Sequence, residues 1–238
     1  MNLVYQIRKR LELRLTGYKM SSRSFLWLMI FCMTLAACNG SKAYYKRGFK
    51  LEEQGLTDEA AESYYGALQR NRNNIEAKVG LKNTGQTVLN KKLEVFTKTR
   101  SLNQKREGVY SFIKAKEYQA KIKKIGVILE IPSYFESDYA EITQSYLLDL
   151  YNEGTELLDK GQFSTAELKF KEIGKFDSNY KDSGALKDLA YLEPLYKTAL
   201  EHLENERFRS AYSDFNKVIH RDPDFKEAKE LKDQSLEL

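Results

Sequence analysis

The sequence predicts an all-α protein in which helical hairpins repeat along the chain, behind an N-terminal export leader. Three segments of similar pattern recur among the 238 residues, at 43–74, 150–180 and 195–225. The chain contains only three Pro and 13 Gly, which disfavours a turn-rich β-sandwich or barrel. An apolar run over residues 25–37 follows a basic stretch, as in a secretory signal.

The net charge of +5 lies in the leader. Six Lys and Arg and one Glu precede position 38, and subtracting them from the totals of 39 basic and 34 acidic residues leaves 33 of each. An isoelectric point near 8.9 would by itself suggest a nucleic-acid partner. Because the remaining chain is neutral, we expect no nucleic-acid binding.

The apolar run is shorter than the roughly 20 residues that a membrane-spanning helix needs. It ends in Leu35-Ala36-Ala37-Cys38, which resembles the bacterial lipobox, where small residues precede a cysteine that is lipidated before cleavage. The resemblance implies that Cys38 becomes the lipid-bearing first residue of a mature lipoprotein. The alternative is an uncleaved anchor in which Cys38 occurs by chance. Since the other cysteine of the chain, Cys32, lies in the leader, we expect no disulfide and no Cys-based metal site. Met20 is an alternative start of the same leader.

The three repeated segments share small and aromatic residues at fixed spacing. A small residue lies in the middle of each first helix, an Ala follows twelve residues later, and an aromatic residue comes four after that. These positions are Gly48, Ala60 and Tyr64, then Gly154, Ala166 and Phe170, then Ala199, Ala211 and Phe215. Such spacing lets two antiparallel helices approach closely, with the ring filling the space beside them. Polar turns at 54–55, 160–161 and 205–206 separate the two helices.

This pattern resembles the tetratricopeptide repeat (TPR), a helix-turn-helix unit of about 34 residues. Asp222-Pro223 is similar to the family's helix-ending Asp-Pro. The resemblance implies a TPR-like solenoid in which each repeat packs on its neighbours. The second and third segments begin 45 residues apart, so we expect an added turn or two of helix over 182–192.

Six parts are expected along the chain. They are the signal peptide 1–37, the lipidated N-terminus with a short tether 38–42, the first repeat with its following helix 43–89, a degenerate helical segment 90–146, the second repeat with an extra helix 147–191, and the third repeat with a capping helix 192–238. The degenerate segment should break at Pro132, with a strand at 126–131 as an alternative, and helix should restart near Ser137. Pro194 should begin a helix, and Pro223 should follow one.

The candidate binding residues are Tyr45, Tyr151 and Tyr196, which occupy the same position in the three segments. In TPR arrays this position of the first helix often points into an inner groove. The resemblance therefore implies three amphipathic anchors for a peptide or helix. The alternative is that these tyrosines pack between repeats, with their hydroxyls at the rim.

Charge is segregated in the middle of the chain. Residues 91–124 hold 11 basic and three acidic residues, whereas residues 125–168 hold nine acidic residues and one Lys. This polarity could steer a partner or place a basic face on anionic lipid. The alternative is solvated helix faces that compensate one another. His202 and His220 are interpreted as packed histidines, not ligands.

No phosphate loop, nucleophile elbow, zinc-protease or Ca²⁺-loop motif is present, so we expect no enzyme, catalytic residue, cofactor, metal or small-molecule substrate. The expected function is a scaffold in the bacterial cell envelope that binds other envelope proteins through the solenoid groove and the membrane through lipid on Cys38. Asn39, by analogy with enteric lipoproteins, favours the outer membrane, facing the periplasm. Alternatives are a component of the outer-membrane barrel-assembly machinery, a regulator of a peptidoglycan-synthesis enzyme and, least supported, an envelope hydrolase.

Overall fold

The computed structural model describes residues 40–237, so the predicted signal peptide and the lipidation site Cys38 lie outside the described residues. Within this range every regular element is a helix and there is no strand, which confirms the all-α prediction. The chain divides into two compact units. Unit 1 contains residues up to 102 together with 110–133, and unit 2 contains 103–109 and everything from 134 onward.

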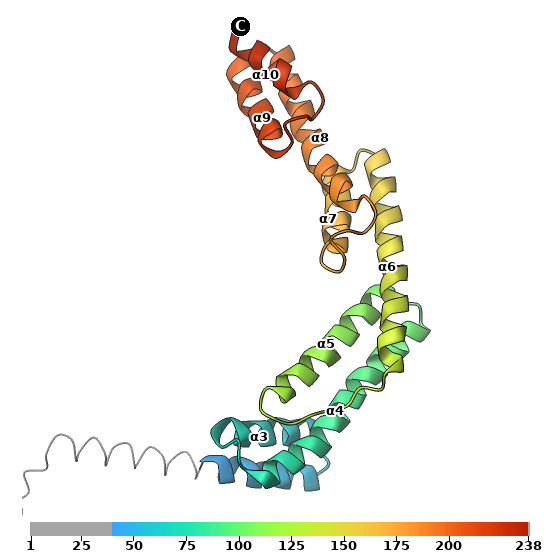
Figure 1. Cartoon of the computed structure of the whole chain (residues 1–238), viewed down its shortest axis with the longest axis vertical. Helices are drawn as coiled ribbons and strands as arrows, with labels where there is room; N and C mark the ends of the chain where they lie inside the picture. Colours follow the sequence, from blue (N-terminus) through green and yellow to red (C-terminus); the bar gives the residue numbers. More distant parts are fainter. Residues whose placement is uncertain (1–39, 238) are drawn as a thin grey trace, which may run out of the picture. The chain divides into compact units, whose positions relative to one another are not determined.

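The helices follow one another along the chain with short turns, except for the longer connections 124–133 and 174–182 (Figure 1). Residues 40–53 form the first described helix. It is followed by α3 (Thr57–Arg70), α4 (Ile75–Ser101), α5 (Lys105–Lys123), α6 (Tyr134–Asp159), α7 (Phe163–Ile173), α8 (Ser183–Glu204), α9 (Phe208–Arg221) and α10 (Ala228–Glu237).

In unit 1 the helix over 40–53 and α3 form a close hairpin. A Cβ added to Gly48 would lie 2.8 Å from the ring of Tyr64, so only glycine allows this approach. Gly80 on α4 meets the other edge of the same ring, where an added Cβ would lie 2.5 Å from Cζ. Tyr64 is therefore buried between three helices. Gly55 gives the turn its positive φ of 76°.

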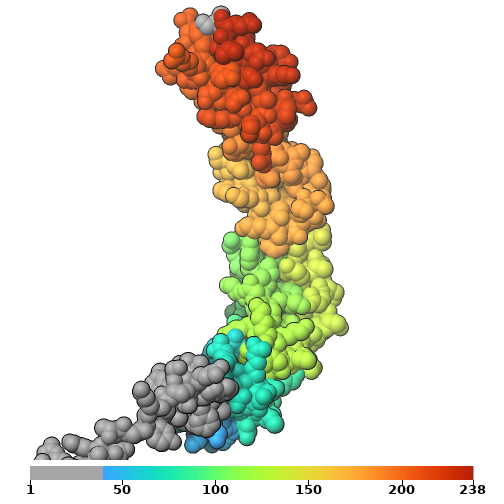
Figure 2. All heavy atoms as spheres, turned by 60° about the vertical axis from the view of Figure 1, so that its left-hand side comes forward, coloured from blue at the N-terminus to red at the C-terminus, as the bar shows by residue number. Residues whose placement is uncertain are grey.

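Unit 2 repeats this arrangement twice. In the hairpin of α6 and α7, a Cβ on Gly154 would lie 2.7 Å from Phe170. In the hairpin of α8 and α9, Ala199 and Phe215 are both fully buried in one cluster with Tyr196 and Phe225. In the space-filling view the red and orange-red atoms of the C-terminal residues pack closely together (Figure 2). The predicted small-to-aromatic positions are thus core positions in all three hairpins.

Two expected helix boundaries differ from the structure. Helix already begins by Gly40, and Ser41 is buried where its Oγ donates to the carbonyl of Ala67 at 2.9 Å, so residues 40–42 belong to the first helix and not to a tether. Pro194 does not begin a helix, because it lies inside α8. The expected extra helix over 182–192 is the first half of α8. Buried apolar residues on both sides of Pro194 hold α8 in one piece, although proline removes one backbone hydrogen bond.

The expected break at Pro132 is present, but the alternative of a strand at 126–131 is wrong for this structure. Residues 127–132 are extended and pair with no strand. They alternate like a strand, because Val127 and Leu129 are buried whereas Ile128 is 67% exposed. Helix restarts at Tyr134, three residues before the expected position.

Candidate partner-binding site

The three candidate tyrosines occupy equivalent places, each against the buried aromatic residue of its own hairpin. The ring centroids lie 5.9 Å apart for Tyr45 and Tyr64. The corresponding distances are 6.3 Å from Tyr151 to Phe170 and 5.8 Å from Tyr196 to Phe215. The register deduced from the sequence therefore holds in space, because each tyrosine meets the residue 19 positions later.

In unit 2 each of these tyrosines is also enclosed by the turn that follows its hairpin. The Tyr151 hydroxyl donates to Asp182 at 2.6 Å, and the Nζ of Lys181 lies 4.1 Å from the ring centroid. One repeat later, Tyr196 donates to Glu227 at 3.1 Å, with Lys226 at 5.0 Å from its ring. Both lysines have a positive φ, 46° and 47°, so the two turns share one backbone shape.

These contacts favour the protonated form of both tyrosine hydroxyls. The hydrogen bond to Asp182 raises the pKa of Tyr151, and burial raises the pKa of Tyr196. Tyr196 is buried, whereas Tyr45 and Tyr151 are half-buried. This geometry matches the packing alternative, in which the ring joins helices and the hydroxyl reaches the rim. Partner binding by the three tyrosines stays a prediction.

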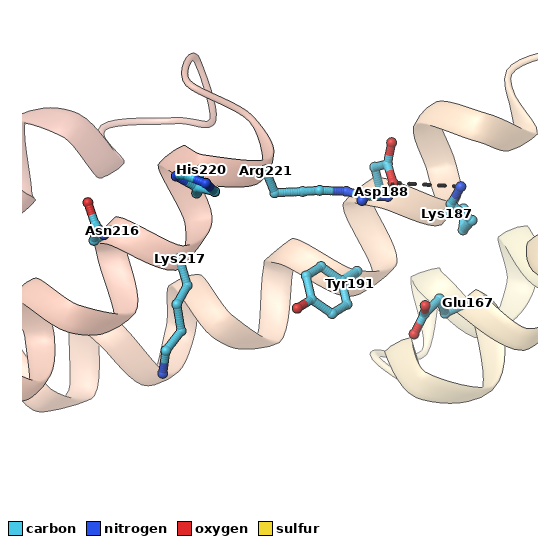
Figure 3. A pocket seen from close by; sticks show the side chains of 8 residues that line it. All are labelled: Glu167, Lys187, Asp188, Tyr191, Asn216, Lys217, His220 and Arg221. Atoms are coloured by element: carbon cyan, nitrogen blue, oxygen red, sulfur yellow. Dashed lines mark hydrogen bonds and ion pairs between the residues drawn. The ribbon is translucent and has the colours of Figure 1, made fainter.

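A groove on unit 2 offers a more open surface. It has a volume of about 760 Å³ and lies among α7, α8 and α9 (Figure 3). We call it the α7–α9 groove. Its lining residues are Glu167, Lys187, Asp188, Tyr191, Asn216, Lys217, His220 and Arg221. Tyr191 is 47% exposed, which makes it an accessible aromatic surface among polar side chains.

The α7–α9 groove is crossed by one ion pair, and each cation that lines it lies near a carboxylate. Arg221 extends from α9 to Asp188 on α8, with a nitrogen-to-oxygen distance of 2.6 Å (Figure 3). This bond to Asp188 raises the pKa of Arg221 above its usual value, so the guanidinium stays charged. Lys187 lies 3.8 Å from the same carboxylate. Lys217 instead pairs with Asp214 at 2.7 Å and is largely exposed. A peptide could contact Lys187, Lys217 and the ring of Tyr191.

Sequence reasoning missed this groove, although one signal pointed to it. Lys187, Asp188 and Tyr191 come from the stretch 182–192, which separates the second and third repeats beyond the usual spacing. The insertion lengthens α8, and its side chains then face α9 across the groove. A departure from the repeat length was therefore the feature to examine for surface residues.

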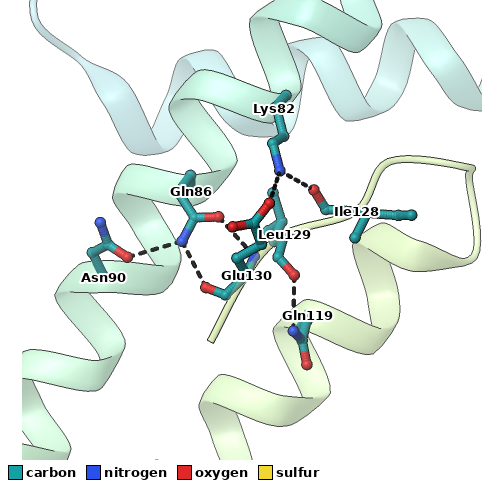
Figure 4. A network of polar contacts seen from close by, with 7 residues as sticks. All are labelled: Lys82, Gln86, Asn90, Gln119, Ile128, Leu129 and Glu130. Atoms are coloured by element: carbon teal, nitrogen blue, oxygen red, sulfur yellow. Dashed lines mark hydrogen bonds and ion pairs between the residues drawn. The ribbon is translucent and has the colours of Figure 1, made fainter. Parts of the chain in front are cut away.

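A second polar site lies in unit 1, where the extended segment 127–132 occupies the space between α4 and α5 (Figure 4). Gln86 binds the backbone of Glu130 twice, donating to its carbonyl at 2.9 Å and accepting from its N–H at 2.8 Å. Lys82 donates to the carbonyl of Ile128, and Gln119 donates to that of Leu129. Side chains thus replace the strand partner that this segment lacks. An open groove of about 720 Å³ remains beside the segment, lined in part by Gln86, Glu130 and Pro132.

The segregated charges are partly paired within each unit. In unit 1, Lys91 pairs with Asp58 at 2.6 Å, and Lys121 pairs with Glu62 at 2.8 Å. In unit 2, Lys105 pairs with Asp149 at 2.6 Å. Of these pairs, only Lys105 with Asp149 joins the basic stretch 91–124 to the acidic stretch 125–168. Steering of a partner by the remaining charge stays a prediction.

The described part of the chain contains no group of three or more acidic, His or Cys side chains that could hold a metal ion. His202 is half-buried, and its Nδ1 lies 2.9 Å from a carboxylate oxygen of Asp214. His220 is exposed and lines the α7–α9 groove, so its interpretation as a packed histidine is wrong. No helix of residues 40–237 is long and apolar enough to cross a membrane.

Comparison with known proteins gives no relative for this chain. No family description matches the sequence, no curated protein matches it, and no solved structure matches its fold.

Proposed function

We propose that this protein is a lipid-anchored, TPR-like scaffold of a bacterial cell envelope. Lipid on Cys38 would hold it at a membrane. Asn39 favours the outer membrane, with the protein on the periplasmic side. The helical repeats would then present a preformed surface to other envelope proteins. Preformed surfaces favour binding because less conformational entropy is lost on association.

One observation carries the repeat assignment. The small-to-aromatic contact recurs in three hairpins at the same spacing, with Tyr64, Phe170 and Phe215 each at most 1% exposed. Chance alignment of apolar residues would not place the three rings in the same contact. This recurrence supports a TPR-like array, in which the helices serve mainly to display surfaces.

The α7–α9 groove is the surface we assign to the partner. Its aromatic ring and flanking cations are groups that commonly dominate binding energy at protein interfaces. An acidic or amphipathic segment of another envelope protein would suit it, with carboxylates on Lys187 and Lys217 and an apolar side chain on Tyr191.

Fractionation of cells that express Cys38→Ser tests the anchor. Without the thiol no lipid can be attached and the leader is not removed at this position, so we expect the variant to lack the mass of the acyl groups, to keep the mass of the leader and to be mislocalised. Unchanged membrane association together with an unchanged mass would contradict the lipoprotein assignment.

Affinity purification of the full chain from solubilised envelopes tests the scaffold. We expect partners to be recovered with the wild type and with Leu236→Ala, a change at an exposed residue outside the groove. Tyr191→Ala combined with Lys217→Ala should reduce their recovery by tenfold or more, on the order of 1.4 kcal/mol. Recovery of barrel-assembly subunits or of a peptidoglycan synthase would choose between these two narrower roles. Turnover of cell-wall substrate by the purified chain would overturn the scaffold assignment.

A further inference from the structure

The first described residues are held against the end of α3 and the start of α4. The Oγ of Ser41 accepts a hydrogen bond from Asn74 at 3.1 Å, while it donates to Ala67. A Cβ on Gly40 would lie 3.1 Å from the side chain of Arg70. Residues 40–46 and 67–79 therefore lie together, and we call this region the leader-side end of unit 1.

The leader-side end is basic, and the opposite end of the same hairpin is acidic. Five basic residues and one acidic residue lie in 40–46 and 67–79, whereas residues 47–63 contain five acidic and two basic residues. The five cations are Lys42, Lys46, Arg70, Arg72 and Lys78. Two of the opposite acids, Asp58 and Glu62, are already paired with lysines of α4 and α5. The surplus charge available to a partner is therefore positive and lies beside the leader.

Apolar side chains are exposed among these cations. Ile75 is 70% exposed and Val79 is 56% exposed, one helical turn apart at the start of α4. Neighbouring aliphatic and basic side chains are the combination that binds at a lipid headgroup boundary, where the cations meet phosphates and the aliphatic groups enter the acyl region.

The position of the apolar run limits what can cover this surface. The run ends at Ala37, and residue 40 is already folded against Arg70. Two residues span at most about 7 Å, so a membrane that holds residue 38 lies next to the leader-side end. This holds for a lipid on Cys38 and for an uncleaved anchor alike.

We infer that the leader-side end of unit 1 docks on the anionic headgroups of the membrane to which the chain is attached. The inference rests on the proposed membrane attachment and adds the face and the lipid class. Cations at 42, 46, 70, 72 and 78 contact the headgroups, and Ile75 and Val79 enter the interface. The opposite end of the hairpin, about 20 Å away along a 14-residue helix, faces water.

A tryptophan reporter tests this orientation in the full chain. In a Trp27→Phe background, Ile75→Trp places a single tryptophan at the leader-side end, and Leu56→Trp places one at the opposite end, where Leu56 is 43% exposed. The purified protein is reconstituted into vesicles of phosphatidylglycerol and dibrominated phosphatidylcholine. We expect bromine to quench Ile75→Trp and to leave Leu56→Trp unquenched, with flotation confirming that both proteins are attached.

Charge variants test the lipid class. Replacing Lys42, Lys46 and Arg72 by Gln should lower the ratio of docked to undocked protein by about fivefold for each cation, on the order of a hundredfold in total. The matched control replaces Lys171, Arg209 and Lys229 by Gln, which are exposed cations of unit 2, and should change nothing. Vesicles without phosphatidylglycerol should reproduce the effect of the first set.

The outcomes distinguish a failure of membrane attachment from a failure of the docking inference. If the protein floats with vesicles but Ile75→Trp is no more quenched than Leu56→Trp, the docking is wrong and the attachment stands. Protein that does not float at all would overturn both. Quenching that persists in the charge variant would contradict the anionic-lipid assignment. A change in Ile75→Trp emission that appears only when other envelope proteins are added would assign the surface to a protein instead.

Discussion

At the residue scale, the close approach of glycine to an aromatic ring decides how the hairpins pack. Gly154→Ala would place a methyl group 2.7 Å from Phe170, which is too close for two carbon atoms. We expect the ring and its helix to shift, at a cost of about 1–3 kcal/mol in the free energy of unfolding, which is the usual range for overpacking a core. Urea unfolding followed by circular dichroism measures this cost.

Gly184→Ala is the matched control, because it lies in α8 with no atom within 4 Å of the added methyl. Alanine there should leave stability unchanged or raise it by about 0.4–1 kcal/mol, since it reduces the freedom of the unfolded chain. Equal effects of the two substitutions would contradict the packing described for Phe170.

The buried Tyr64 should make stability depend on alkaline pH. Burial and its hydrogen bond to Glu52, at 2.6 Å, raise the pKa of Tyr64 above its ordinary value of 10.0. Above that pH the unfolded chain loses the phenolic proton while the folded chain keeps it, so stability is full below about pH 10 and falls as pH rises.

Unfolding free energies measured from about pH 9 to pH 11 check this prediction. Tyr64→Phe should reduce the slope, because one of the tyrosines with a raised pKa is removed. Glu52→Gln should reduce it less, since burial still acts on the phenol. A slope that is the same in all three proteins would show that Tyr64 does not control it.

At the element scale, the extended segment 127–132 depends on side chains of α4 and α5. Gln86→Ala removes both hydrogen bonds to the Glu130 backbone and should destabilise unit 1 by about 1–2 kcal/mol. Hydrogen exchange of the Glu130 amide should become faster. Asn90→Ala is the control, because Asn90 contacts this network only by accepting from Gln86. Equal exchange in both variants would contradict the bonding shown in Figure 4.

The hairpins could be predicted from the sequence because their determinants are local. Gly154, Ala166 and Phe170 lie within 17 residues, so their spacing alone identifies the shared face of two helices. The path of the segment around Glu130 could not be predicted, because its partner Gln86 is 44 residues distant. The unbroken course of α8 was also missed. A proline suggests a helix start, whereas burial on both sides of Pro194 outweighed that preference.

The candidate site could likewise be predicted from the sequence only where its determinants are local. The equivalence of Tyr45, Tyr151 and Tyr196 followed from the repeat pattern. The α7–α9 groove depends on how the side chains of α8 and α9 meet, as Arg221 and Asp188 do, and no local pattern encodes that meeting.

At the scale of the whole molecule, the division of charge at Cys38 gives a direct test of processing. Removal of residues 1–37 would leave 33 basic and 33 acidic residues, so the isoelectric point should fall from 8.9 to near neutrality. Isoelectric focusing of protein extracted from membranes measures this change. Cys38→Ser should keep the basic isoelectric point, because a leader without the cysteine is not cleaved there. A wild-type protein that focuses near 8.9 would contradict cleavage.

The uninterrupted course of α8 has a consequence for how unit 2 responds to stress. It packs on both α7 and α9, so one continuous helix belongs to two hairpins. Neither hairpin can open without withdrawing the surface on which the other rests. An array of separate repeats can fray one unit at a time from its end. Here α7 and α9 share one support, so heat or mechanical load should release them together.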